Sequence, residues 1–422
     1  RELVELQYST YNRSLIPLLN ARGIYIVDAY EDLENFQAEY VDRYFEENIY
    51  PVLTPMAVDA SRPFPLIRNK TLNIVALLEE NPKKDDLLGK EEEKKLKAEG
   101  KKGGTIYEYA TVQVPSVLPR LIPIPSVKEG EKSFILLEQI IEKNISKLFL
   151  GHKVVCAYPY RIMRNADLSF DEDEAEDLLK EIEKSLKKRQ WGEVIRLEVE
   201  YGIDKRLLAF LKDELRVESE DDIFKINGPI DLTYLMKMYG LEGCDDLRYK
   251  PYTPQPVPQI QQGESIFDAI KKGDILLHHP YQTFDPVVEF IRQAAKDPDV
   301  LAIKQTLYRV SGNSPIIAAL AQAAENGKQV SVLVELKARF DEENNIVWAR
   351  KLEKAGCHVI YGLVGLKTHS KITLVVRRED TGIRRYVHLA TGNYNDSTAK
   401  LYTDCGIFTC DERFGEDATA VF

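Results

Sequence analysis

The stretch Gly365-Leu366-Lys367-Thr368-His369-Ser370-Lys371-Ile372-Thr373-Leu374-Val375-Val376 decides how the second half of the chain folds. The apolar, β-branched run after the histidine predicts a strand. Because alternate residues of a strand face the same way, we expect His369 and Lys371 to project together and Ser370 to face the other side. A neutral imidazole can attack phosphorus, and an ammonium group beside it can hold the oxygens of the transferred group. The pattern therefore indicates phosphoryl-transfer chemistry.

A Gly-containing polar turn, Thr391-Gly392-Asn393-Tyr394-Asn395, follows the next β-rich run. Its spacing from the His-x-Lys pair leads us to expect Asn393 beside His369. Lone histidines are mostly structural, and we predict that role for His358 and His388. The His-x-Lys strand followed by a Gly-Asn turn instead resembles one half of a phospholipase-D-like phosphotransfer site.

The chain length and amino-acid composition indicate a globular protein of more than one domain. The chain has 422 residues, of which 44% are hydrophobic and 30% charged. No apolar run approaches membrane-spanning length, and no signal peptide opens the chain. The chain begins with Arg1 and ends with the apolar pair Val421-Phe422, so we expect both ends to be cut from a longer polypeptide.

The cysteine content indicates the cellular compartment, and the net charge limits the classes of binding partner. The five cysteines form no C-x-x-C pair, which indicates a reducing compartment. We predict a cytoplasmic protein and leave peripheral membrane association open. The net charge of −11 argues against wholesale nucleic-acid binding, so a polyanionic substrate needs a local basic site.

The sequence pattern of the first half predicts an α+β domain that is followed by a linker. A helix over residues 1–20 precedes strand-like segments such as Leu72–Leu78, and we expect another helix over 134–145. Four prolines between Pro251 and Pro258 mark the linker. We predict three parts, which are the last helix of an N-terminal helical domain (1–23), an α+β head domain (24–255) and an α/β catalytic domain (256–422) that is incomplete at its C-terminus.

Three polar features of the first half have structural interpretations. Interleaved lysines and glutamates over 82–104 predict a surface loop or short helix. The acidic run Asp171–Glu174 predicts a helix start rather than a metal site. Arg161 and Arg164, on a predicted strand, either touch a phosphate chain or form structural ion pairs.

The second half alternates strands with single helices, which implies a parallel or mixed sheet covered on both faces. We expect strands over 300–309, 329–336, 358–361 and 386–390, and helices over 287–295, 316–324 and 344–355. Ligands of such sheets gather at the carboxyl ends of the strands. Arg309 and Arg339 both fall at or just past such an end.

Several motifs of the second half occur together. They are Ile303–Val310 (IKQTLYRV), Val334–Asn345 (VELKARFDEENN), Gly365–Lys371 (GLKTHSK), Thr391–Asn395 (TGNYN) and Leu401–Asp404 (LYTD), with Asp274–Phe284 (DILLHHPYQTF) before them. In order and spacing they closely resemble the polyphosphate kinases of the histidine-phosphorylating type, whose catalytic domains are phospholipase-D-like. The resemblance is strong over 256–422 and weaker but collinear before it.

The resemblance implies a reversible reaction in which ATP and a polyphosphate chain of n units give ADP and a chain of n+1 units. It implies that His369 becomes phosphohistidine and that Arg309 and Arg339 lie at the magnesium–phosphate site. Arginine has no lone pair for a cation, so we interpret both as clamps on oxygens that Mg²⁺ bridges. Tyr402 matches a tyrosine associated with the nucleotide. The implied partners are ATP, ADP and inorganic polyphosphate, with Mg²⁺ as cofactor, in a homo-oligomer.

We add Lys371 and Asn393 to the catalytic set because of their spacing from His369. The family also has a second His-containing half-site, but no second His-x-Lys occurs here, and Val376 stands where the phospholipase-D signature places an aspartate. We therefore expect low activity from this chain alone. Two other functions stay open, a phosphodiesterase of the phospholipase-D type and a non-catalytic module for polyphosphate binding or dimerisation. ATP dependence separates the kinase from the diesterase.

Overall fold

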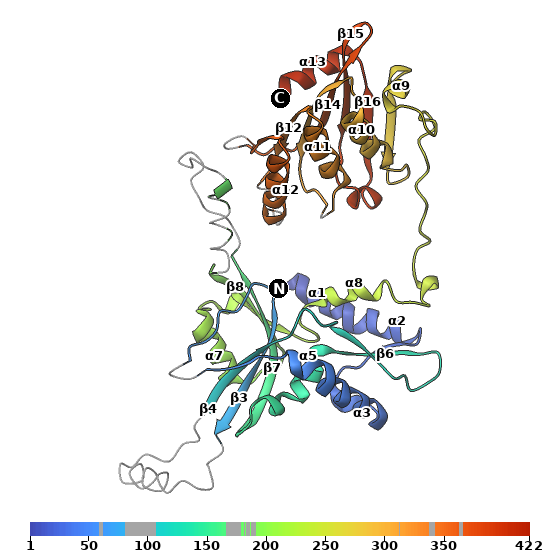
Figure 1. The fold of residues 1–422 in the computed structure, drawn as a ribbon. Helices are drawn as coiled ribbons and strands as arrows, with labels where there is room; N and C mark the ends of the chain where they lie inside the picture. The colour runs from blue at the N-terminus through green and yellow to red at the C-terminus, as the bar shows by residue number, and fades with distance from the viewer. Residues whose placement is uncertain are drawn as a thin grey trace, which may run out of the picture. The chain divides into compact units, whose positions relative to one another are not determined.

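The computed structural model describes residues 1–58, 62–80, 107–165, 179–180, 182, 186, 191–311, 313–336, 342–362 and 366–422. These residues form two compact units of mixed α/β structure (Figure 1). The first lies within Arg1–Asp167 and Arg189–Arg248, and the second within Leu168–Lys188 and Tyr249–Phe422. Our finer division at residues 23 and 255 stays a prediction. In the part of the chain that the structure describes, no helix is both long and apolar enough to cross a bilayer.

The first unit contains two sheets, with strand orders β1-β6-β5 and β2-β4-β3-β7-β8-β9. The strands are β1 (Ile24–Ile26), β2 (Pro55–Val58), β3 (Leu72–Glu80), β4 (Tyr107–Gln113), β5 (Leu121–Ile124), β6 (Lys132–Leu136), β7 (His152–Arg164), β8 (Val194–Glu200) and β9 (Ile223–Ile226). The helices are α1 (Glu2–Thr10), α2 (Ile16–Asn20), α3 (Asn35–Tyr44), α5 (Leu137–Lys143), α7 (Lys205–Leu215) and α8 (Leu235–Met238).

Helix α7 shows how sequence and packing agree in this unit. The Asp204 side chain accepts a hydrogen bond from the backbone N–H of Arg206 and caps the first turn. Leu207, Leu211 and Leu215 recur every four residues and are buried, so one face of the helix packs on the six-stranded sheet.

The second unit is built on one seven-stranded mixed sheet with strand order β10-β16-β15-β14-β11-β12-β13. The strands are β10 (Ile275–His279), β11 (Val300–Leu307), β12 (Gln329–Val334), β13 (His358–Ile360), β14 (Lys371–Glu379), β15 (Gly382–Ala390) and β16 (Asp404–Thr409). Strands β11, β12 and β13 are parallel, and the remaining pairs are antiparallel. The prediction of a mixed sheet in this half is confirmed.

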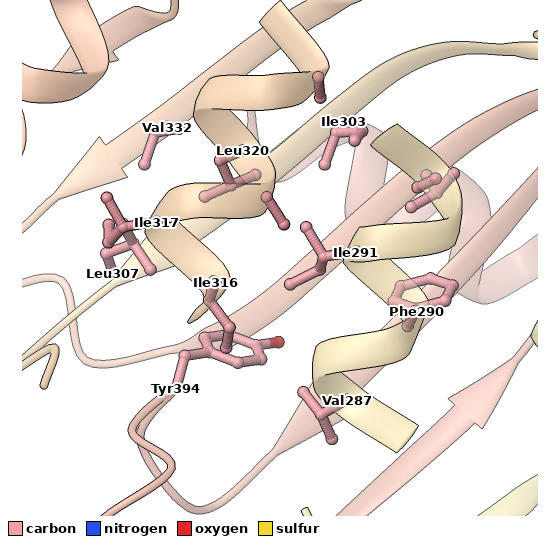
Figure 2. Close-up of a cluster of buried hydrophobic side chains, with 14 of the residues drawn as sticks. Val287, Phe290, Ile291, Ile303, Leu307, Ile316, Ile317, Leu320, Val332 and Tyr394 are labelled. Carbon is pink, nitrogen blue, oxygen red and sulfur yellow. The ribbon is translucent and has the colours of Figure 1, made fainter. Parts of the chain in front are cut away.

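Helices cover both faces of this sheet. One face carries α9 (Ile266–Lys271), α10 (Asp285–Lys296), α11 (Pro315–Glu325) and α12 (Glu342–Lys354), and the other carries α13 (Glu412–Val421). Figure 2 shows the larger core, in which side chains of α10 and α11 meet those of β11 and β12. Each large side chain buried there contributes about 1.5–3 kcal/mol relative to leaving it exposed. Tyr394, from the turn after β15, lies in the same core against the start of α11 (Figure 2).

Strand directions bring one set of strand ends together. Gln305 pairs with Thr373, so the carboxyl end of β11 lies beside the start of β14. Lys371 pairs with Ala390, so the end of β15 lies on the other side of the same start. The predicted nucleophile and the polar turn therefore meet at one edge of the sheet, next to Arg309.

The structure corrects several sequence predictions. Strand β14 begins at Lys371, so His369 precedes the strand instead of lying on it. The predicted helix over 134–145 is a strand, β6, followed by the short helix α5. Strands β10 and β16 were not predicted. The stretches 82–104 and Asp171–Glu174 lie outside the described residues.

Candidate active site

Three of the predicted site residues surround the ring of Tyr308. The ring of His369 lies edge-on to it, with centroids 5.2 Å apart and planes at 74°. The guanidinium carbon of Arg309 lies 5.6 Å from the Tyr308 centroid, and Nζ of Lys371 lies 5.3 Å from it. A potential nucleophile and two cations are thus brought together on a single aromatic side chain.

The backbone on both sides of His369 is fixed by buried side chains. The backbone N–H of Thr368 donates to the carboxylate of Glu335 (2.7 Å), which is only 4% exposed. On the other side, the Thr306 hydroxyl donates to the carbonyl of Ser370 (2.8 Å) and accepts from the N–H of Ile372 (3.1 Å). The His369 side chain itself is exposed, so a rigid frame presents an accessible imidazole.

Lys371 is a buried cation at the start of β14. It is only 6% exposed, and its ammonium group donates a hydrogen bond to the carbonyl of His369. Burial lowers the pKa of this lysine, and the charge of Asp404 opposes that shift. A positive charge held away from water attracts phosphate oxygens more strongly than a solvated one does.

Arg309 is held in an unusual backbone conformation. Its φ is +52°, in the left-handed region that non-glycine residues seldom adopt. The side-chain amide of Asn395 donates to the Arg309 carbonyl (2.9 Å), and the Asn395 oxygen accepts from the N–H groups of Ser397 and Thr398 (3.0 and 3.1 Å). These bonds tie the turn after β15 to the segment that carries Arg309.

The turn itself is closely packed. A Cβ added to Gly392 would lie 2.7 Å from the carboxylate carbon of Asp404, so any other residue there would have to displace the Asp404 side chain. The Thr391 hydroxyl donates to the same carboxylate (2.8 Å). At the far end of the turn, the Tyr394 hydroxyl lies 3.0 Å from Nδ1 of His388. The turn is therefore anchored both at β16 and in the core.

Histidines 388 and 279 differ from His369 in burial. His388 is 1% exposed, as expected for a structural histidine, and burial lowers its pKa to about 3. Its Nε2 has no hydrogen-bond partner among the described groups. His279 is 5% exposed, and burial also lowers its pKa. Both imidazoles are too enclosed to reach a phosphate chain.

The remaining predicted residues are Asn393, Tyr402 and Arg339, and for the two that the structure describes it gives no contact with the Tyr308 ring. Asn393 is half-buried in the turn, and its carbonyl accepts from the N–H of Asn395 (2.7 Å). Tyr402 is 63% exposed, between the short 3₁₀ helix Thr398–Lys400 and β16. Arg339 lies outside the described residues, so its predicted convergence with Arg309 stays a prediction.

The two arginines of β7 have structural partners. Arg161 pairs with Glu198 (3.2 Å), and Arg164 donates to the carbonyls of Ile67 and Gly192 (3.1 and 2.8 Å). Of the two interpretations left open, the structural one agrees with these contacts. A cavity of about 270 Å³ in the first unit contains none of the predicted site residues. Its Arg120 is engaged by Glu138 and by the carbonyls of Ile230 and Asp231.

No direct metal site forms on the described residues. Among them, no three His, Cys, Asp or Glu side chains gather closely enough to hold a metal ion. Arg309 has no lone pair to offer one. Of the residues predicted for the magnesium–phosphate site, Arg309 can therefore bind phosphate oxygens but not the metal itself.

Two residues of the site were missed by sequence reasoning, Tyr308 and Asn395. Both lie inside the quoted motifs, directly beside Arg309 and two residues after Asn393. Tyrosine on a buried strand end is expected in a core, and asparagine in a turn is expected to bond its own backbone. Only the tertiary contacts show that each one touches a predicted site residue.

Comparison with known proteins identifies the class. Residues 36–238 match the polyphosphate kinase middle domain, and residues 265–422 match the polyphosphate kinase C-terminal domain 1. The chain belongs to the polyphosphate kinase family.

Individual polyphosphate kinases are similar in sequence to this chain over its whole length. It is 52% identical over 424 residues to the polyphosphate kinase of Halalkalibacterium halodurans and 44% identical over 427 residues to polyphosphate kinase 1 of Chlorobaculum tepidum. The chain spans 57% and 58% of the length of these relatives. The crystal structure of the Porphyromonas gingivalis polyphosphate kinase is similar with a TM-score of 0.75 and 27% identity, covering 100% of this chain and 58% of that one.

Proposed function

We propose that this chain carries the phosphoryl-accepting half of an ATP:polyphosphate phosphotransferase, with His369 as the nucleophile. One observation carries the proposal: His369, Arg309 and Lys371 all contact the ring of Tyr308, at an edge where β11, β14 and β15 end or begin. Membership of the polyphosphate kinase family supports ATP and inorganic polyphosphate as the substrates. Because the chain has a net charge of −11, a polyanionic substrate needs a local basic site, and Arg309 and Lys371 form such a pair of cations.

The proposed reaction has two steps. In the first, the unprotonated ring nitrogen of His369 forms a bond to the γ-phosphorus of ATP, and the bond from that phosphorus to the bridging oxygen breaks, which releases ADP. In the second, a terminal oxygen of polyphosphate forms a bond to the same phosphorus, and the phosphorus–nitrogen bond breaks. Arg309 and Lys371 hold the transferred oxygens in both steps, and Asn393 lies in the adjoining turn.

Mg²⁺ enters this proposal with the substrate. When bound, it would neutralise phosphate charge. Arg309, together with Arg339, clamps the phosphate oxygens. Tyr402 is exposed enough to stack on the nucleotide base or to donate its hydroxyl.

We further propose that the second unit has a phospholipase-D-like fold and supplies one half-site, which in the family faces a second half-site from a further domain. The His-x-Lys pair at the start of β14 and the polar turn after β15 support this assignment. A diesterase would use the same nucleophile, but its aspartate position is occupied by Val376. Each donor missing from the facing half costs about 10²–10³ in rate, so low activity is expected from one half alone. A cytoplasmic location and homo-oligomerisation stay predictions.

Nucleotide dependence tests the proposed function. The chain is incubated with ADP and polyphosphate and ATP is measured by luciferase, while bis-p-nitrophenyl phosphate hydrolysis is followed without nucleotide. We expect slow ATP formation that His369→Ala abolishes, and no His369-dependent diester hydrolysis. Diester hydrolysis that needs His369 but no nucleotide would replace this proposal with the diesterase.

A further inference from the structure

Tyr308 stands at the centre of the site, yet it takes part in no step described above. It is half-buried directly after β11, so the strand fixes its backbone while one part of the ring stays accessible. The His369 ring meets it at 74°, an edge-to-face geometry that aromatic pairs favour. A rotation of the imidazole to another rotamer would lose this contact.

Two cations share the same ring. Arg309 and Lys371 lie 5.6 and 5.3 Å from its centroid, within the range of cation–π attraction. An aromatic face attracts a cation without cancelling its charge, as a carboxylate would. The contacts with Tyr308 therefore order Arg309 and Lys371 without themselves neutralising either charge.

We propose that Tyr308 is a positioning residue of the phosphoryl-transfer site, whose ring orients the His369 imidazole and holds Arg309 and Lys371 beside it before phosphate binds. The inference rests on the proposed function for its purpose, but its geometry is independent of ATP. The ring, not the hydroxyl, carries the proposed role. Tyr308→Phe should therefore preserve the site, and Tyr308→Leu, which keeps apolar bulk but has no π face, should not.

Phosphoramidate provides a test that needs no nucleotide. It phosphorylates histidine directly, because the phosphorus–nitrogen bond to ammonia breaks as the bond to the imidazole nitrogen forms. Mass spectrometry then gives the rate at each histidine of the 422-residue chain. His358, exposed on β13 outside the site, is an internal control in the same molecule.

We expect His369 in the unaltered chain to react about tenfold faster than His358, since two cations beside it attract the anionic reagent. Tyr308→Phe should keep that ratio within about twofold, and Tyr308→Leu should reduce it about tenfold. Tyr201→Leu, at an exposed tyrosine of the first unit, should leave it unchanged. A ratio that Tyr308→Leu does not change, or one that Tyr308→Phe lowers as far as Tyr308→Leu does, would overturn the proposal.

A second measurement needs no variant. In the unaltered chain with labelled histidine and tyrosine, NMR should show cross-relaxation between the ring protons of Tyr308 and His369. Its absence would also overturn the proposal. If ATP fails to label His369 while the phosphoramidate ratio still depends on the Tyr308 ring, the proposed function fails and the role of Tyr308 stands.

Discussion

The side-chain amide of Asn395 donates a 2.9 Å hydrogen bond to the carbonyl of Arg309, a non-glycine residue with φ of +52°. The two residues are 86 positions apart in sequence, and the bond joins the end of β11 to the turn after β15. It holds a backbone conformation that arginine seldom adopts, and the guanidinium carbon of the same residue lies 5.6 Å from the centroid of the Tyr308 ring.

Asn395→Ala should weaken both the fold and the site. We expect the free energy of unfolding to fall by about 1–3 kcal/mol, because a carbonyl and two N–H groups lose their partner. We also expect phosphorylation of His369 to slow by about ten- to a hundredfold, since Arg309 is no longer held in place. Asn326→Ala is the matched control, because Asn326 makes a 2.9 Å bond to the carbonyl of Ala295 outside the site. Urea unfolding and labelling kinetics check both, and equal effects on labelling would contradict the role of Asn395.

Lys371→Met should separate stability from activity. Burial lowers the pKa of Lys371 below its ordinary 10.5, so the ammonium is disfavoured in the folded chain. Between the folded and unfolded pKa values the unfolded chain binds more protons, and the stability of the wild type rises with pH there. The Met variant should therefore be at least as stable at pH 7, with an advantage that shrinks toward pH 10.5.

Labelling of His369 should nevertheless fall by about tenfold or more in Lys371→Met, because one charge that stabilises the transferred phosphate is lost. Lys354→Met, at the exposed end of α12, serves as the control. Urea unfolding at several pH values and labelling kinetics provide the two readings. A Met variant that is less stable than the wild type at pH 7 would contradict the cost of burying this charge. A Met variant whose His369 is labelled at the normal rate would contradict its role in phosphoryl transfer.

His388 should make the second unit sensitive to acid. Burial lowers its pKa from the ordinary 6.5 to about 3 in the folded chain. Below pH 6.5 this histidine is therefore protonated in the unfolded chain but not in the folded chain. Stability is thus lost as pH falls, by about 2 kcal/mol at pH 5 from this residue. His388→Gln should remove that loss from the pH profile, leaving a smaller one in the same direction from His279. His358→Gln should not, and an unchanged acid profile in His388→Gln would refute the assignment.

The sequence predicted the strands with β-branched runs and the helices with a clear apolar stripe, and it failed where burial and residue type disagree. In β10, Leu276 is 62% exposed while His279 is 5% exposed, so the apolar pattern does not follow the pleat. Strand β16 contains Asp404 and a buried Gly406, neither of which favours strands. The segment 134–145 has a helical pattern, but pairing with β1 and β5 overrides it at β6.

The site was predictable in composition but not in arrangement. The motifs predict His369, Lys371 and Arg309 as site residues, yet strand β14 starts only at Lys371, because its neighbours β11 and β15 end at Leu307 and Ala390. What brings the residues together is tertiary. No local pattern indicates that Tyr308 would gather them or that an asparagine 86 positions away would fix Arg309.

The central claim is that His369 accepts the phosphoryl group, and its most direct measurement is the position of the label after incubation with [γ-³²P]ATP. We expect an acid-labile, alkali-stable label that mass spectrometry locates on His369, slow in this chain, lost in His369→Ala and retained in His358→Gln. An acid-stable label on Ser370, a label on another histidine, or a wild-type chain that stays as unlabelled as His369→Ala would contradict the account.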